Sequence, residues 1–189
     1  MTYPPYQHAP APAPAPARPA RRGGPTTWFL GSAMVCVGLM AGLFFAFTVS
    51  VMPGLAAGDD RTYVTAMQHI NDKIENGLFG LVFTGALLFT AVAAVLLLVR
   101  RQRGAAVWAG AAVLCYLLVL ALTMGVEIPL NNELAAAGPA DRIPDLAGVR
   151  HDFESVWVPV NDARTALCVL ALVCLAPALH LHGRGTPRP

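Results

Sequence analysis

Long apolar stretches alternate with short polar segments along this 189-residue chain. Three of the stretches, residues 28–51, 77–99 and 105–126, are 22 to 24 residues long and contain no charged side chain. A helix rises ~1.5 Å per residue, so it needs about 20 residues to cross the ~30 Å hydrocarbon core of a bilayer. Each of the three stretches is therefore predicted to be a membrane-spanning helix.

A fourth apolar stretch, residues 165–179, is too short to cross a bilayer unaided, at about 22 Å for a helix of this length. Extending it toward the N-terminus brings in Asn161 and Arg164, which are three residues apart and so share a helix face. Trp157 is then expected to anchor the helix at the membrane interface. We place the fourth span at about residues 160–180. The short connections between spans predict an all-α, integral membrane, up-down four-helix bundle.

The charged residues indicate how this bundle is oriented. Only 13% of residues are charged and 56% are hydrophobic, against about 25% charged in a typical soluble domain. The segments before residue 28, between residues 99 and 105, and after residue 182 hold eight arginines and no acid, while the other two loops hold five basic residues and all eleven acids. Basic residues are retained on the cytoplasmic side. We expect a multi-pass protein of the cell membrane with both termini cytoplasmic and residues 28–182 as its transmembrane domain.

The two tails have no apolar face to bury. Residues 1–27 are rich in alternating Ala and Pro, which favours extended polyproline II, so they are predicted to be a disordered cytoplasmic tail. Residues 183–189 form a second cytoplasmic tail. The first span is longer than the 7 to 15 apolar residues of a cleaved signal peptide, which favours an uncleaved signal anchor. The four cysteines lie within spans without metal-ligand spacing, so they are interpreted as small hydrophobic residues.

Small residues recur every fourth position on two spans. The stripes are Gly38, Gly42, Ala46 and Ser50 on the first span, and Ala86, Thr90 and Ala94 on the second. Helices in lipid associate through close backbone approach at small residues. Both stripes are therefore predicted to seat a neighbouring helix, although alanine-rich spans also produce such stripes by chance.

A polar cluster, "MGVEIPLNNELAAAG" at residues 124–138, ends the third span. Pro129 removes a backbone donor and clashes with the preceding turn, so the helix should kink or end there. Asn131 and Asn132 offer amide donors to the carbonyls that this frees. A lone charge on Arg164 is costly at this depth. We therefore expect Arg164 to contact Glu127 or Asn131, unless Glu127 is simply a solvated helix end.

A third polar segment, "AMQHINDKIENG" at residues 66–77, lies on the same outer side. With helical spacing, Gln68, Asn71 and Glu75 share one face. Met67, Ile70 and Ile74 form the apolar face. Polar groups from three segments are thus predicted to converge on the outer end of one bundle.

Several functions do not fit this pattern. Haem and di-iron bundles need histidines or Glu-x-x-His pairs within the helices, and ion-coupled transporters place ionisable groups at mid-membrane; none of the four apolar stretches, residues 28–51, 77–99, 105–126 and 165–179, holds a histidine or a carboxylate. Nucleic-acid binding lacks a basic face. We expect no metal, no cofactor and no nucleic-acid partner, and we expect the arginines to contact membrane lipid.

Four segments resemble the anthrone-oxygenase-like family of small four-span membrane proteins. They are "GLFFAFTVSVMPGL" (42–55), "AMQHINDKIENGLF" (66–79), "VEIPLNNELAA" (126–136) and "WVPVNDART" (157–165). The Pro-Leu-Asn-Asn and Asn-x-x-Arg-Thr elements are the most specific, and the resemblance covers about residues 28–180. The sequence departs from the family pattern at Val160, Asp162 and Gly77, where an aromatic residue, histidine and proline are usual.

The resemblance implies oxidation of an anthrone, or a similar hydrophobic polyketide-like phenol, to a quinone by molecular oxygen without a bound metal or flavin. Such chemistry needs a base and donors that hold an oxyanion. The candidate bases are His69 and Glu127, the candidate donors are Asn131, Asn161 and Arg164, and the candidate substrate-binding residues are Asn71, Asn132 and Trp157. Each also has a structural interpretation, as a loop residue or helix cap. The alternative function is a non-catalytic membrane module, a small-molecule binder or partner subunit.

Overall fold

Helices account for all the regular secondary structure in the part of the chain that the computed structural model describes, residues 24–185. Most of the two predicted tails, residues 1–27 and 183–189, lies outside the described residues. The elements are α1 (Pro25–Ala46), η1 (Phe47–Val51), α2 (Met52–Ala56), α3 (Asp60–Ile74), α4 (Gly77–Val99), α5 (Arg103–Leu122), η2 (Thr123–Glu127), α6 (Ile128–Ala136) and α7 (Leu146–Gly185). The segments η1 and η2 are π-helical turns.

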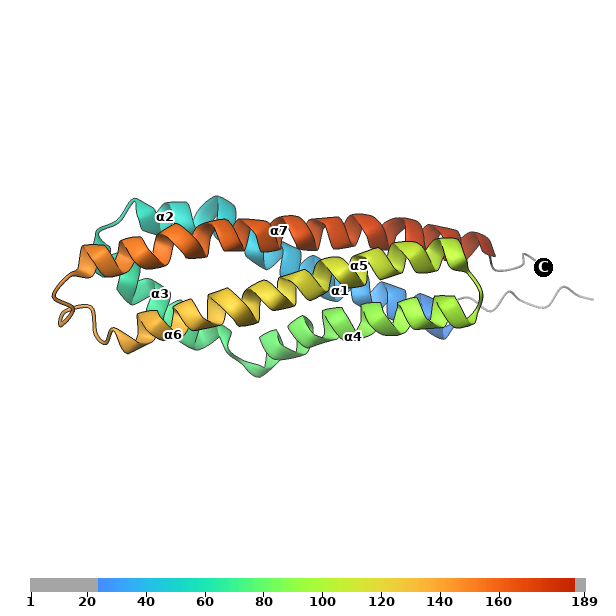
Figure 1. The fold of residues 1–189 in the computed structure, drawn as a ribbon, viewed down its shortest axis with the longest axis horizontal. Coiled ribbons are helices and arrows are strands. Elements are labelled where there is room, and N and C mark those ends of the chain that lie inside the picture. The colour runs from blue at the N-terminus through green and yellow to red at the C-terminus, as the bar shows by residue number, and fades with distance from the viewer. Residues whose placement is uncertain (1–23, 186–189) are drawn as a thin grey trace, which may run out of the picture.

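Four long helices make up the bundle. They are Pro25–Ala56, Gly77–Val99, Arg103–Ala136 and Leu146–Arg184, and each is long and apolar enough to cross a membrane. Helix α1 packs on α4 and α7, and α5 packs on the same two neighbours. Successive long helices run in opposite directions along the bundle (Figure 1). The prediction of an all-α, up-down, four-helix membrane bundle is confirmed.

Small side chains fill the middle of the bundle. Ala33, Ala86, Ala109, Ala112 and Ala171 are fully buried, which allows the backbones of neighbouring helices to approach closely. The small-residue stripe predicted on the second span is buried as a whole, because Thr90 and Ala94 join Ala86 in the core. That stripe packs α4 against its neighbours, as predicted.

The prediction that the small-residue stripe on the first span seats a neighbouring helix is wrong. Gly42, Ala46 and Ser50 are exposed on the outside of the bundle, and a Cβ atom added to Gly38 or Gly42 would meet no atom within 4 Å. The face of α1 that packs carries Leu30, Ala33, Val37, Met40 and Phe44 instead. Since α1 is apolar on every side, the spacing of its small residues did not reveal which side faces inward.

Pro53 and Pro129 lie near the helix ends opposite the C-terminus, and neither proline ends its helix. Each follows a π-helical turn, in which the N–H of Ile128 bonds to the carbonyl of Thr123 and the N–H of Met52 bonds to the carbonyl of Phe47. A π turn holds one extra residue and thus makes room for a ring that would clash with a regular turn. The third span therefore continues past Pro129 to Ala136, where the sequence predicted a kink or an end.

Helix α7 extends beyond the predicted fourth span at both ends. It has 40 residues, and at 1.5 Å per residue it is about 60 Å long. Pro159 and Pro177 both lie inside it. The polar residues before Thr165 led us to begin the span at residue 160, but several of them pair with other helices inside the bundle, so the helix starts at Leu146.

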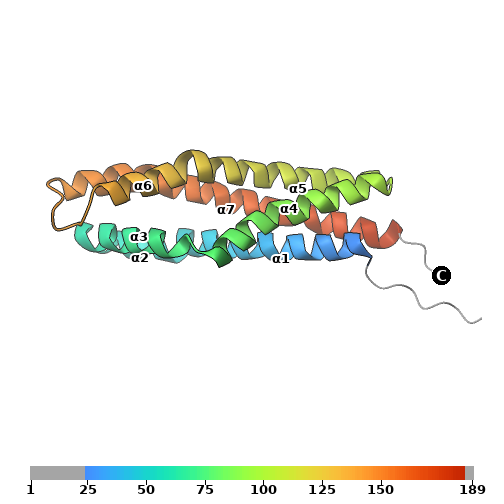
Figure 2. The same cartoon turned by 90° about the horizontal axis from the view of Figure 1, so that it is seen from below.

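Helices α2, α3 and α6 lie together at the end of the molecule opposite the C-terminus (Figure 2). With the first half of α7 they enclose a second core that is richer in large side chains. Its members include Phe47, Tyr63, Met67, Phe153 and Trp157. Trp157 is only 4% exposed, so the prediction that it anchors α7 at the membrane interface is wrong.

Arg150 fastens α3 to this end of the bundle. Its guanidinium donates to the Asp60 carboxylate at 2.9 Å and to the carbonyls of Gly58 at 3.2 Å and Ala56 at 3.1 Å. It also lies 4.6 Å from the centre of the Tyr63 ring, and burial raises the pKa of the Tyr63 phenol well above its usual value. These contacts hold α3 in place across the end of the bundle.

Candidate functional site

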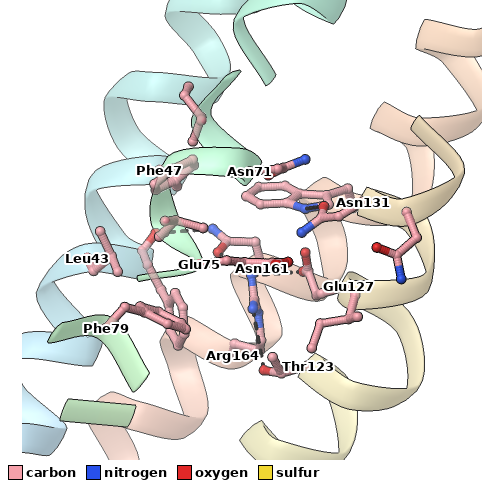
Figure 3. Close-up of a pocket in the computed structure, with 16 residues that line it drawn as sticks. Leu43, Phe47, Asn71, Glu75, Phe79, Thr123, Glu127, Asn131, Asn161 and Arg164 are labelled. Atoms are coloured by element: carbon pink, nitrogen blue, oxygen red, sulfur yellow. Dashed lines mark hydrogen bonds and ion pairs between the residues drawn. The ribbon is translucent and has the colours of Figure 1, made fainter. Parts of the chain in front are cut away.

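A cavity of about 290 Å³ lies between the middle of the bundle and the second core. Its walls come from α1 with η1, α3, the start of α4, η2 with α6, and α7. Half of the 16 residues that line it are apolar or aromatic, and the eight polar ones are Asn71, Glu75, Thr123, Glu127, Asn131, Asn132, Asn161 and Arg164. Figure 3 shows these side chains converging from different helices on one space.

Glu127 and Arg164 form a buried ion pair on the wall of the cavity. The Arg164 Nη2 atom lies 2.9 Å from the Glu127 Oε1 atom, and the two residues are 5% and 1% exposed, respectively. The predicted contact between Arg164 and Glu127 is confirmed, and burial rules out the alternative that Glu127 is a solvated helix end. The π turn η2 carries Glu127, so the local widening of the helix presents this carboxylate to α7.

The pair is incompletely satisfied. Although the two charges are in contact, the N–H bonds of Arg164 are not aimed at the carboxylate, and neither oxygen of Glu127 has a hydrogen-bond donor among the described residues. The Nε atom of Arg164 likewise has no acceptor there. A buried polar atom without a partner costs about 1–3 kcal/mol. The site therefore keeps a free acceptor and a free donor at the edge of a cavity.

Asn161 sets the position of the guanidinium. Its amide nitrogen donates to the carbonyl of Phe44 and to the hydroxyl of Thr48, both at 3.1 Å. The amide oxygen is therefore turned toward Arg164, whose Nη2 donates to it at 3.0 Å. Thr48 in turn donates to the Asp162 carboxylate at 2.8 Å. A chain of hydrogen bonds thus joins η1 to α7 and orients the charged group in the cavity.

Aromatic rings pack around the cation. The guanidinium carbon of Arg164 lies 4.3 Å from the centre of the Phe44 ring and 5.7 Å from that of Trp157. Ring faces stabilise a cation at this distance while keeping water away. The indole N–H of Trp157 donates to the Asn131 amide oxygen at 3.2 Å, which leaves the amide hydrogens of Asn131 free for another acceptor.

Seven of the eight site residues predicted from the sequence line this cavity. They are Asn71, Glu127, Asn131, Asn132, Trp157, Asn161 and Arg164. His69 is the exception, because it is exposed and lines a shallow surface depression together with Arg61 and Gln68. Of the two candidate bases, only Glu127 faces the cavity.

Phe44 and Thr48 connect the site to α1, and neither was predicted from the sequence. Phe44 supplies both a ring and a carbonyl to the site, and Thr48 supplies a hydroxyl. Both lie in an uninterrupted apolar run. The one feature that "FTVSVMP" shares with "TMGVEIP" is the final proline, and in the structure each proline follows a five-residue π turn. A proline alone does not predict such a turn.

This arrangement is suited to proton removal from a bound molecule and to stabilisation of the anion that results. A buried carboxylate with an unpaired oxygen is a base of fixed position. The free hydrogens of Arg164 and Asn131 are donors for an oxyanion. The aromatic and aliphatic walls exclude water from a ligand of low polarity.

Comparison with known proteins assigns the family. The anthrone oxygenase family model matches residues 77–174, just over half of the chain. A search of curated proteins and a search of solved structures each found no significant match. The matched segment includes Glu127, Asn131, Asn161 and Arg164, whereas α1 and α3 precede it. The most polar part of the cavity thus lies within the segment that is similar to the family, and the chain belongs to the anthrone oxygenase family.

Proposed function

We propose that this protein oxidises a hydrophobic phenolic or polyketide-like substrate of the anthrone type to a quinone with molecular oxygen and without a bound metal or flavin. The observation that carries the proposal is the buried Glu127–Arg164 pair, whose unpaired atoms lie at the edge of a cavity. An arrangement that served stability alone would leave fewer of these atoms unpaired, because each adds to the cost of folding.

The cavity supports a ligand of this class by size and by surface. Small-molecule sites in proteins are mostly apolar, with a few polar groups that fix orientation, and begin at about 300 Å³. The cavity is close to that lower limit, with walls that include Leu43, Phe47, Ile70 and Phe79. A flat, fused-ring aromatic of low polarity fits such a space.

The reaction replaces a ring CH₂ group by a carbonyl: one CH₂ and one O₂ give one C=O and one water. The Glu127 carboxylate first removes a proton from the CH₂ group, and the negative charge delocalises onto the oxygen of the substrate's existing ring carbonyl. Arg164 donates a hydrogen bond to that oxygen and so stabilises the anion. The anion transfers one electron to O₂, and the carbon radical and superoxide combine to form a C–O bond.

The remaining steps return Glu127 to its initial state. Protonated Glu127 gives its proton to the new peroxide, which becomes a hydroperoxide. The carboxylate then removes the second hydrogen from the same carbon while the O–O bond breaks, so that the carbonyl forms and hydroxide leaves. Hydroxide takes the proton from Glu127 and departs as water. Proton transfer by a positioned group contributes about 10²–10⁴-fold to the rate of such steps.

The test is product formation by purified protein in detergent, with a panel of anthrones under oxygen. Quinone formation and oxygen consumption are measured above the uncatalysed rate. Glu127→Gln should reduce turnover per folded protein by at least about 100-fold. Glu133→Gln is the matched control. Glu133 lies six residues after Glu127 on the same long helix, but it is exposed and does not line the cavity. Binding of an anthrone by wild-type protein without quinone formation would instead support a non-catalytic binder.

We also propose that the cavity lies toward the outer face of the cell membrane and that both termini are cytoplasmic. The sorting of eight arginines from all eleven acids supports this orientation. A reporter fused after Arg188 should behave as cytoplasmic, and one inserted near Gly138 as external. The opposite location of either reporter would contradict the proposed orientation.

A further inference from the structure

Asn71 presents an unsatisfied amide to the cavity. It lies on α3, its side chain lines the cavity, and the residue is only 9% exposed. Its Nδ2 atom is buried and has no hydrogen-bond acceptor among the described residues. The buried, unpaired amide nitrogen of Asn71 therefore lies at the wall of the proposed substrate site.

The side-chain amide nitrogen of Gln68, on the same helix, has two hydrogen-bond acceptors. The Nε2 atom of Gln68 donates to the carbonyls of Leu134 at 2.8 Å and Gly138 at 2.9 Å. Gln68 thus fastens α3 to α6, whereas the Asn71 amide fastens nothing. An unpaired buried donor destabilises the folded protein, and a leucine of similar size would fill the same place without that cost. The amide is explained if a ligand supplies the acceptor.

The polar groups of the cavity lie at two levels along the bundle. Arg164 and Thr123 mark the lower level, where Nη1 of Arg164 approaches the Thr123 hydroxyl at 3.4 Å. Asn131, bonded to Trp157, marks the upper level. The guanidinium carbon of Arg164 lies 5.7 Å from the centre of the Trp157 ring, so the two levels are about one helical turn apart. Figure 3 shows Asn71 on the same side of Glu127 as Asn131 and away from Arg164.

We propose that Asn71 determines substrate specificity by donating a hydrogen bond to an oxygen that lies away from the reacting carbon. The preferred substrates are then fused-ring aromatics with a second oxygen substituent, a hydroxyl or carbonyl, at the end that reaches the upper level. This inference rests on the proposed function for the reacting end, where Glu127 and Arg164 act. Asn71 precedes residue 77, where the match to the family begins, so the selecting amide lies outside the matched segment.

The test compares two ligands that differ only in peripheral oxygens, a dihydroxyanthrone and unsubstituted anthrone. Equilibrium binding to the full-length protein in detergent is measured without oxygen, so that no turnover is needed. Wild-type protein should bind the dihydroxy compound more tightly. In Asn71→Leu this preference should fall by about tenfold, as expected for the loss of one buried hydrogen bond. The melting temperature of ligand-free Asn71→Leu should rise, because the unpaired donor is gone.

Two further variants separate selection from indirect loosening of α3. Asn71→Ala should lower the ligand preference as Asn71→Leu does, which shows that added bulk is not the cause. Gln68→Leu removes two hydrogen bonds that hold α3, so it should lower the melting temperature and keep the ligand preference.

An unchanged preference in both Asn71 variants would overturn the inference. So would an equal loss of preference in Gln68→Leu, because the position of α3 would then be the cause. Absence of turnover in wild-type protein would count against the proposed function alone, since the ligand preference is measured by binding.

Discussion

At each end of the bundle, buried polar side chains connect α1, α7 and the long helix that starts with α5. The two groups differ in how many of their polar atoms have hydrogen-bond partners. At the end nearer the C-terminus, Nδ1 of His182 lies 2.7 Å from the Gln102 amide oxygen and Nε2 lies 3.2 Å from the Thr27 hydroxyl. The Gln102 oxygen only accepts, so Nδ1 donates, and in the neutral imidazole Nε2 then accepts. At the end that holds the cavity, Glu127 and Arg164 retain unpaired atoms.

The difference indicates two purposes for one kind of helix contact. His182 is 2% exposed and lines neither the site cavity nor the depression beside His69. Its hydrogen bonds therefore hold helices together. The Glu127–Arg164 pair is equally buried but lies on a cavity, and its free atoms are available to a ligand. Of these two equally buried groups, the one that keeps unpaired atoms is the one that borders a cavity.

The largest effect is expected when one member of the Glu127–Arg164 pair is removed. Arg164→Met leaves the Glu127 charge buried and uncompensated, which costs about 3–5 kcal/mol in the free energy of unfolding. The double variant Glu127→Leu/Arg164→Met removes both charges and should recover most of that loss, or exceed wild-type stability. Neither variant should form quinone.

Unfolding in detergent measures the stabilities, and quinone formation per folded protein measures the activity. A double variant as unstable as the single one would mean that the Glu127–Arg164 pair is structural, like the hydrogen-bonded group around His182. Quinone formation by the double variant would contradict the role proposed for Glu127.

A smaller effect, confined to stability, is expected at the end of the bundle that holds His182. His182→Leu leaves Gln102 and Thr27 without their shared partner, which should lower the free energy of unfolding by about 1–3 kcal/mol. Turnover and ligand binding per folded protein should not change. His180→Leu, two residues away at an exposed position, is the matched control and should be close to wild type. Lost ligand binding in His182→Leu would show that the two ends are coupled.

Thr48 should have a still smaller effect on stability and a clear one on activity. Thr48→Val keeps the shape but removes the hydroxyl between Asn161 and Asp162, at a cost of about 1 kcal/mol. Asn161 then loses one of the two contacts that turn its oxygen toward Arg164, so turnover should fall. Thr90→Val is the matched control, since the Thr90 hydroxyl donates only within its own helix, to Ala86 at 2.6 Å. Equal turnover in both variants would contradict the orienting role.

Much of the fold and part of the site could be predicted from the sequence. Uncharged runs of sufficient length have only one stable arrangement in a bilayer, so the spans were clear. The contact of Arg164 with Glu127 followed from the cost of a lone charge near the membrane. Residues such as Phe44 and Thr48 could not be predicted, because their roles depend on which face of α1 is turned inward and on a π turn.

The helix ends and faces were the main errors, and they share a cause. Hydropathy treats each polar side chain as if water were its partner, so polar residues were taken to mark the ends of spans. Here Arg150 and Arg164 find partners within the protein, and the helices continue. An apolar helix gives no contrast between its faces, so the inward side is decided by the shape of neighbouring helices.

The smallest effect is expected between the two ends, at Gly42. The spacing of small residues predicts that Gly42→Leu should separate packed helices, but the residue is exposed and a Cβ atom there would meet no atom within 4 Å. A leucine would extend toward lipid, and it also favours helix more than glycine does. The free energy of unfolding should therefore stay within about 0.5 kcal/mol of wild type or increase. Ala33→Leu is the contrasting variant on α1, because Ala33 is fully buried and the added atoms should cost about 1–3 kcal/mol. Thermal unfolding of both variants in one detergent would decide between the two faces of α1. A larger loss for Gly42→Leu than for Ala33→Leu would mean that α1 is rotated relative to this structure, and Phe44 would then no longer face Arg164.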